Sequence, residues 1–93
     1  MDTPLHLASR NGHTHAIQLL IEQGANINEK NNDGWTPLHH ASCKGHTGAI
    51  QLLIRAGADV NAKTNLRCTP IQCALRYRHT DVVQLLKSYE VCE

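Results

Sequence analysis

Histidine and cysteine are the residues of this chain that could most readily carry chemistry. The 93 residues include seven His and four Cys. His13 lies two positions before His15, and His39 directly precedes His40. Imidazoles and thiolates are the usual protein ligands of zinc, and both also serve as general bases or nucleophiles. These histidine pairs therefore raise the hypothesis of a metal or acid–base site.

The spacing of these residues argues against such a site. The cysteines are Cys43, Cys68, Cys73 and Cys92, and they form no C-x-x-C pair, whereas zinc sites use close pairs. No G-x-S-x-G, Walker, G-x-G-x-x-G or H-E-x-x-H segment occurs in the sequence. We therefore expect no catalytic residue, no metal site and no cofactor. An enzyme or metal protein that uses His and Cys is the least favoured of three hypotheses.

Composition and charge restrict the remaining classes. The net charge is +1, the aromatic content is 3% with no Phe, and the basic residues are scattered. Because nucleic-acid recognition needs a clustered basic face or stacking platforms, we expect no nucleic-acid partner. No apolar run is longer than residues 19–21, so we expect no membrane insertion. Without a secretory pattern, the cysteines are interpreted as reduced thiols of a cytoplasmic or nuclear protein.

An internal repeat organises the elements that must position these residues. Residues 3–6 read Thr-Pro-Leu-His, residues 36–39 repeat them, and residues 69–72 carry the related Thr-Pro-Ile-Gln. The period is 33 residues, the difference between positions 3 and 36 and between positions 36 and 69. Residues 16–21 and 49–54 are also identical. A period of this length indicates stacked structural units.

Each unit is predicted to contain two helices joined by a turn. Thr followed by Pro is typical of an N-cap residue and the first position of a helix. That helix should end after about two turns at Gly12 or Gly45, where a left-handed residue is needed. Thr14 and Thr47 are expected to cap the second helix, which carries a wide apolar face.

Polar loops are predicted to connect the units. The second helices should end at Gly24 and Gly57, and the segments that follow, 25–35 and 58–68, are rich in Asn, Asp and Gly. Such composition is typical of extended loops or hairpins. The chain is therefore predicted to be all-α, with a protruding loop in each unit.

The repeated pattern resembles the ankyrin repeat. Residues 34–42 read Gly-Trp-Thr-Pro-Leu-His-His-Ala-Ser, close to the G-x-TPLHxAA motif, and residues 45–46 and 52–61 continue the pattern. The resemblance implies a solenoid of stacked helix-turn-helix pairs with projecting β-hairpin loops. It also implies that His6 and His39 hydrogen-bond to Thr and to the backbone of neighbouring hairpins. The repeat-periodic histidines are accordingly interpreted as structural.

A single ankyrin-repeat domain is expected over residues 1–93. Repeat 1 should span about 2–34 and is truncated at its N-terminal side, because no hairpin precedes it. Repeat 2 should span about 35–67 and repeat 3 about 68–93. An array of three repeats is near the lower limit of stability.

The third repeat departs from the other two. Gln72, Arg78 and Glu90 replace the motif histidine, the turn glycine and the terminal glycine, and Lys87 replaces an isoleucine of the second helix. A polar outer face is typical of a C-terminal capping repeat.

The resemblance implies a binding surface rather than a catalytic site. Ankyrin-like proteins bind partner proteins on the concave side, which hairpin tips and the outward part of the first helices form. The positions expected on this face are those where the copies differ most: Trp35, Asn32, Asp33, Lys44, Cys43, Arg10, Asn11, Asn65, Leu66, Arg67, Cys68, Arg76 and Tyr77. Leu7, His40 and Cys73 are expected on the groove floor or as ordinary helix surface.

Trp35 is the foremost candidate anchor. A lone Trp on a polar hairpin is costly to expose, and Trp, Tyr and Arg dominate binding hot spots. The alternative is that its ring packs against the next hairpin.

One modification site also follows from the resemblance. Cytosolic ankyrin repeats are common substrates of an asparaginyl hydroxylase that selects a hairpin Asn after an acidic and an aliphatic residue, eight positions beyond a Leu. Asn61 fits this pattern, with Leu53 and Asp59 in the required places. Asn28 fits less well, because Asn26 stands at the acidic position.

We therefore expect a non-catalytic module that binds a protein partner of unknown identity and is itself a monomer. The second hypothesis is a structural one, in which the chain is a spacer or a fragment of a longer ankyrin array within a scaffold, adaptor or inhibitor. An engineered consensus array would also show similar copies, but four free thiols argue against that origin.

Overall fold

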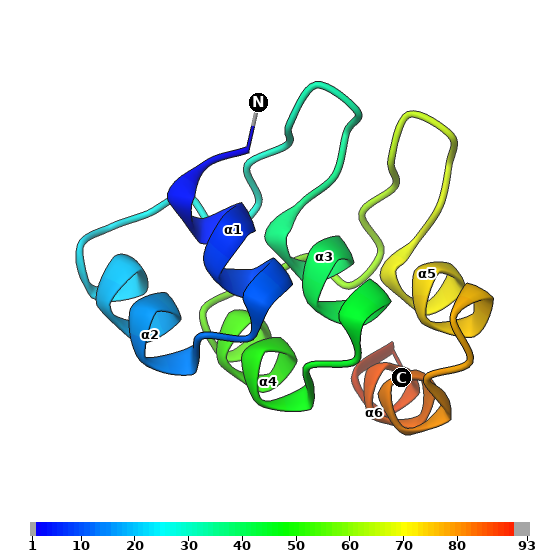
Figure 1. Ribbon diagram of the computed structural model, residues 1–93. Coiled ribbons are helices and arrows are strands. Elements are labelled where there is room, and N and C mark those ends of the chain that lie inside the picture. The colour runs from blue at the N-terminus through cyan, green and yellow to red at the C-terminus, as the bar shows by residue number, and fades with distance from the viewer. Residues whose placement is uncertain (1, 91–93) are drawn as a thin grey trace.

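Six helices arranged as three antiparallel pairs make up the fold. The computed structural model describes residues 2–90 of the chain, with side chains as far as Tyr89. The helices are α1 (Pro4–Asn11), α2 (Thr14–Glu22), α3 (Pro37–Lys44), α4 (Thr47–Arg55), α5 (Pro70–Arg76) and α6 (Thr80–Glu90). Helices α1, α3 and α5 form one row, α2, α4 and α6 form a second row, and two long loops project from the first row (Figure 1). The predicted all-α solenoid of helix pairs is confirmed.

The Thr-Pro motif starts the first helix of every repeat, as predicted. Thr36 is an extended N-cap residue that accepts a hydrogen bond from the backbone N–H of His39, and Pro37 occupies the first turn. The Thr36 backbone N–H donates in return to Nδ1 of His39, at 3.1 Å. Thr3 forms the same reciprocal capping box in α1, as Thr69 does in α5. Two backbone donors that helix formation leaves unpaired are thereby satisfied.

The expected capping of the second helices by threonine is wrong. Thr14 and Thr47 are already the first helical residues, and the N-cap positions belong to His13 and His46, whose side chains make no capping bond among the described residues. The ring of His46 has a different partner, because its Nε2 bonds to the carbonyl of Arg10 in the preceding repeat, at 3.1 Å. The turn histidine thus joins successive repeats rather than capping its own helix.

The motif histidines join each repeat to the loop that follows. Nδ1 of His39 accepts from the backbone of Thr36, so the proton of the neutral ring lies on Nε2, which donates to the carbonyl of Cys68 at 2.9 Å. His6 makes the equivalent bond to the carbonyl of Trp35, at 2.7 Å. Both rings are fully buried. The structural interpretation of these histidines is therefore confirmed.

The core is an aliphatic layer between the two rows of helices. Its fully buried large side chains are Leu5, Ile17, Leu38, Ile50, Leu53, Leu86 and Val82. These residues recur at equivalent places in the repeats, so each interface between repeats buries the same kind of apolar surface. Burial of such side chains is the main favourable term in folding.

The two projecting loops are hairpin-shaped but contain no β-strand within residues 2–90, which corrects the expected β-hairpins. In the first loop, Oδ1 of Asn31 accepts from the backbone N–H groups of Asp33 and Trp35, and the backbone N–H of Asn31 donates to the carbonyl of Trp35. In the second loop, the hydroxyl of Thr64 accepts in the same way from Leu66 and Cys68. A side chain therefore takes the bonds that a strand ladder would otherwise make.

The loops also contact each other. The backbone N–H of Asn65 donates to the carbonyl of Asp33 at 3.0 Å, and the Asn65 amide donates to the carbonyl of Asn32. Gly34 is buried here in a left-handed conformation, with φ of 79°. Arg67 takes that conformation at the equivalent position of the next loop, with φ of 65°. The close approach of the loops, rather than the left-handed backbone alone, requires glycine at position 34.

The outer side of α6 is polar, as the departures of the third repeat predict. Asp81, Gln84, Lys87 and Ser88 are exposed, whereas Val82 is buried. Glu90 takes the place of the terminal glycine of the repeat, and its side chain lies outside the described part of the chain.

A pair of glycine substitutions tests the loop contact. A Cβ at position 34 would lie 2.7 Å from the backbone nitrogen of Asn65, whereas a Cβ at Gly24, with φ of 88°, would meet nothing within 4 Å. We expect Gly24→Ala to lower the free energy of unfolding by about 1 kcal/mol, the cost of a left-handed alanine. Gly34→Ala should lower it by about 2–3 kcal/mol, because the interloop bond is lost as well. Urea denaturation followed by circular dichroism measures both, and equal losses would contradict the loop contact.

The buried histidine at position 39 predicts a pH dependence of stability. Burial lowers the pKa of His39 below its ordinary value of 6.5. As the pH falls through that value, His39 becomes protonated in the unfolded chain but stays neutral in the folded chain. The free energy of unfolding therefore decreases. His39→Gln should remove this part of the decrease and should itself cost about 1–3 kcal/mol at pH 7 through the lost bond to Cys68.

Denaturation curves between about pH 7 and pH 5 check this expectation. His15→Gln, on an exposed site of α2, controls for the loss of a histidine as such. An unchanged pH slope in His39→Gln would contradict the assignment.

Candidate functional site

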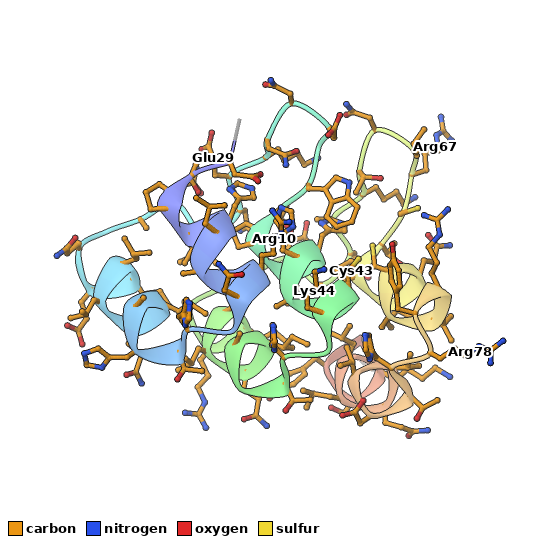
Figure 2. The ribbon with its side chains drawn as sticks, viewed as in Figure 1. Arg10, Glu29, Cys43, Lys44, Arg67 and Arg78 are labelled. Carbon is orange, nitrogen blue, oxygen red and sulfur yellow. The ribbon has the colours of Figure 1, made fainter. Side chains whose placement is uncertain are left out.

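A cavity of about 410 Å³ lies on the face from which the loops project. It is enclosed by the N-terminal segment, the first loop, the outward side of α3 and the end of α5. The lining residues are Asp2, Asn31, Asp33, Trp35, His40, Cys43, Lys44 and Tyr77. Figure 2 shows Cys43 and Lys44 near the end of α3, with Arg10 on the neighbouring helix α1. Side chains from all three repeats therefore meet at one site.

Trp35 forms one wall of this cavity. Its ring is half-buried and lies against His40, with ring centres 5.1 Å apart, and against His39 at 5.8 Å. The ring therefore packs on the helix that follows it, and part of its surface still faces the cavity. Such a partly packed aromatic ring can bind a partner with little loss of side-chain entropy.

A charged group and two polar side chains form a second wall. A carboxylate oxygen of Asp2 accepts from the amide of Asn31 at 2.7 Å and lies 3.4 Å from Nε2 of His40. The bond from Asn31 holds the pKa of Asp2 below its ordinary value, so this carboxylate is ionised at neutral pH. Burial lowers the pKa of His40, so its ring is neutral there. This side of the cavity therefore carries the negative charge of Asp2.

Two thiols lie at the base of the same region. Cys43 and Cys73 are both buried. The neighbouring Cys73, together with the charges of Lys44 and Arg76, lowers the pKa of Cys43 against the opposing effect of burial. Cys43 in turn, together with burial, raises the pKa of Cys73.

The cavity brings together some of the residues that the sequence indicated as partner-binding and leaves others apart. Those that line it are Asp33, Trp35, Cys43, Lys44 and Tyr77. Those that are exposed elsewhere are Arg10, Asn11, Asn32, Asn65, Leu66, Arg67 and Arg76. The remaining one, Cys68, is only partly buried, and its carbonyl accepts the bond from His39. Leu66 is 84% exposed near the tip of the second loop.

Sequence reasoning missed two lining residues. Asp2 occupies the position that is equivalent to Trp35 in the next repeat, one period earlier, and alignment of the copies could have indicated it. Asn31 belongs to an Asn-Asn-Asp-Gly run that is typical of a turn, and this signal could have identified it as the residue that orders the loop. Neither side chain is needed to explain the repeat pattern itself.

The three residues expected at the groove floor have different environments. Leu7 is exposed on the side of α1, His40 lines the cavity, and Cys73 is only 4% exposed. Of the three, His40 alone contributes to the cavity wall.

The two candidate modification sites differ in their contacts. Asn28 joins repeats 1 and 2, because its amide donates to the carbonyl of Gly57 at 3.2 Å and its oxygen accepts from the N–H of Asp59 at 2.8 Å. Asn61 is exposed, and its side chain makes no hydrogen bond to another described residue. Hydroxylation of Asn61, with Asn28 as the weaker site, stays a prediction.

The described part of the chain holds no group of three or more His, Cys, Asp or Glu side chains placed to bind a metal ion. Among the same residues, no helix has the length and apolar character needed to cross a membrane.

Comparison with known proteins finds repeats of one kind. A family model described as "Ankyrin repeats (3 copies)" matches residues 1–64. A putative ankyrin repeat protein of Rickettsia bellii is 47% identical over 36 residues, which are 39% of this chain and 15% of that protein.

Two human proteins show matches of similar length. Transient receptor potential cation channel subfamily A member 1 is 53% identical over 34 residues, and protein phosphatase 1 regulatory subunit 12A is 47% identical over 34 residues. Each match covers 37% of this chain and 3% of the human protein. The chain thus corresponds to a small part of the curated relatives that it matches.

Proposed function

Because the chain belongs to the ankyrin repeat family, whose repeats are generally protein–protein interaction modules, we propose that it is a non-catalytic module that binds a partner protein. The binding surface is the concave face around the cavity between the first loop, α3 and α5. One observation carries this proposal: residues that differ between the repeats converge there from all three units.

The rigidity of the surroundings supports binding at this face. The first loop is held by Asn31 from within and by Asn65 of the second loop. The end of this loop is fixed by the buried ring of His6, which bonds to the carbonyl of Trp35 at 2.7 Å. A preformed surface pays little ordering entropy when a partner docks, so a few anchor side chains suffice for specificity.

The charges of the cavity indicate what kind of partner surface would fit. Asp2 and Asp33 come from the N-terminal segment and the first loop, Lys44 comes from α3, and the rings of Trp35 and Tyr77 also line the cavity. Such a site favours a partner segment that presents a basic group to the carboxylates and an apolar or aromatic group to the rings.

Substitution of the exposed anchors tests the proposal. Partner proteins captured from lysate by the unmodified chain are identified, and their affinities are then measured with Lys44→Ala and Tyr77→Ala proteins. Both side chains are exposed, so their loss should leave the fold intact. We expect the Kd of a true partner to rise about tenfold or more in the Tyr77 variant, as at a hot spot.

Matched controls lie on the opposite row of helices. Gln51→Ala on α4 and Gln84→Ala on α6 replace exposed residues far from the cavity lining. Partners that tolerate the cavity variants but are lost with these controls would place binding on the other face and contradict the proposal.

A second candidate role is stacking within a longer array, and the N-terminal edge of the fold favours it. Pro37 and Pro70 are fully buried by the preceding repeat, whereas the equivalent Pro4 is exposed. Leu53 is likewise buried, whereas the equivalent Leu20 is partly exposed. A groove of about 250 Å³ with mostly apolar walls lies at this edge. Another ankyrin repeat would cover the same surface.

Fusion of an additional repeat tests this role. A copy of residues 35–67 placed directly before Asp2 should raise the urea midpoint of unfolding, because it buries the apolar groove. The same fusion with Leu20→Glu at the junction serves as the control and should gain less. Equal midpoints with and without the added copy would show that the edge is not a stacking surface.

A further inference from the structure

A pair of thiols lies where two repeats meet, and the proposed protein binding does not explain it. Cys43 is near the end of α3, and Cys73 lies in α5, the adjacent first helix of the next repeat. Their exposed fractions are 9% and 4%. Figure 2 shows sulfur beside the Cys43 label, in the space between α3 and α5. The two thiols are neighbours across this interface, and each has the largest single effect on the pKa of the other.

We propose that Cys43 and Cys73 form a peroxide-sensitive thiol–disulfide site, in which Cys43 is oxidised first and Cys73 then closes an intramolecular disulfide between repeats 2 and 3.

The stacking of repeats does not require thiols at these positions. One period earlier, the equivalent residues are Arg10 on α1 and His40 on α3, two helices that pack together between repeats 1 and 2. The same packing therefore accepts residues other than cysteine at both positions. A cysteine pair at the second interface is a property of this chain rather than of the repeat.

Solvent access differs between the two thiols. Cys43 lines the cavity of about 410 Å³, whose wall also includes the exposed side chains of Lys44 and Tyr77. Cys73 is not among the lining residues. Hydrogen peroxide is small enough to enter such a cavity, and it would meet Cys43 before Cys73. This geometry assigns the attacking role to Cys43 and the resolving role to Cys73.

The electrostatic surroundings favour the same order. The neighbouring Cys73 and the cations Lys44 and Arg76 lower the pKa of Cys43 against the opposing effect of burial. Cys43 and burial raise the pKa of Cys73, so Cys73 keeps its proton. A cysteine reacts as the thiolate, and cationic neighbours are typical of reactive cysteines.

The chemistry balances with peroxide as the oxidant. The Cys43 thiolate attacks one oxygen of hydrogen peroxide, the O–O bond breaks, and Cys43 becomes a sulfenic acid while hydroxide leaves. The sulfur of Cys73 then attacks the sulfenic sulfur, the S–O bond breaks, and a disulfide forms with the loss of water. Two electrons pass from the two thiols to one peroxide molecule, and a thiol reductant reverses the change.

Peptide mapping after peroxide treatment of the reduced full chain tests the proposal. Trypsin releases residues 31–44, which contain Cys43, and residues 68–76, which contain both Cys68 and Cys73. We expect a disulfide that joins these two peptides, assigned to Cys73 by fragmentation and reversed by dithiothreitol. The disulfide should be lost in Cys43→Ser and Cys73→Ser proteins and retained in the matched control Cys68→Ser. In Cys73→Ser protein, dimedone should label Cys43 as the trapped sulfenic acid.

Three results would overturn the proposal. A disulfide between Cys43 and Cys68 in the unmodified chain would assign the resolving role to the wrong residue. Oxidation of Cys68 or Cys92 while Cys43 remains open to alkylation would show that Cys43 is an inert buried thiol. A disulfide between two chains instead of within one would remove the role of the repeat interface. Mapping of the unmodified chain decides among these outcomes even if a serine variant folds poorly.

Discussion

The neutral imidazole of the motif histidine is the interaction on which the rest of the structure depends. The ring of His39 accepts from the backbone of Thr36 at one nitrogen and donates to the carbonyl of Cys68 at the other. One buried side chain thus completes the start of a helix and anchors the loop of the following repeat. Because both partners are backbone groups, these two bonds fix the angle between the helix pair and the loop, whatever side chains the two elements carry. Where Gln72 replaces histidine, it completes the capping box with Thr69.

The residues that maintain the fold are therefore different from the residues that form the surface. Backbone groups of the loops are satisfied by one side chain in each copy, Asn31 in the first loop and Thr64 in the second. Because the loop backbone is maintained by different residue types, the outward positions can vary without loss of the fold. The cavity beside Trp35 is built largely from these variable positions, and two carboxylates and two aromatic rings line it.

The properties that distinguish this chain arise where its copies break their own symmetry. Pro4 is exposed where its two equivalents are buried, which leaves an apolar edge at the first repeat. Arg78 adopts a left-handed conformation, with φ of 62°, where the earlier copies have glycine. Two cysteines meet at the second interface in place of a cation and an imidazole. Each of these differences is local, so the fold tolerates it. Each also gives one surface chemical properties that the repeat pattern does not predict.

Local chemistry made much of this fold predictable, because its signals act over a few residues. Thr-Pro pairs identified the helix starts, Gly12 identified a helix end, and the period of 33 residues identified the stacking. The same local reasoning failed for Thr14, whose hydroxyl does not cap α2. The sequence by itself thus determined the family, the elements and the pool of variable surface positions. Only the tertiary structure decided that Asp2 joins Trp35 at one cavity while Leu66 stands apart, because the relative placement of repeats depends on packing and hydrogen bonds between residues about one period apart.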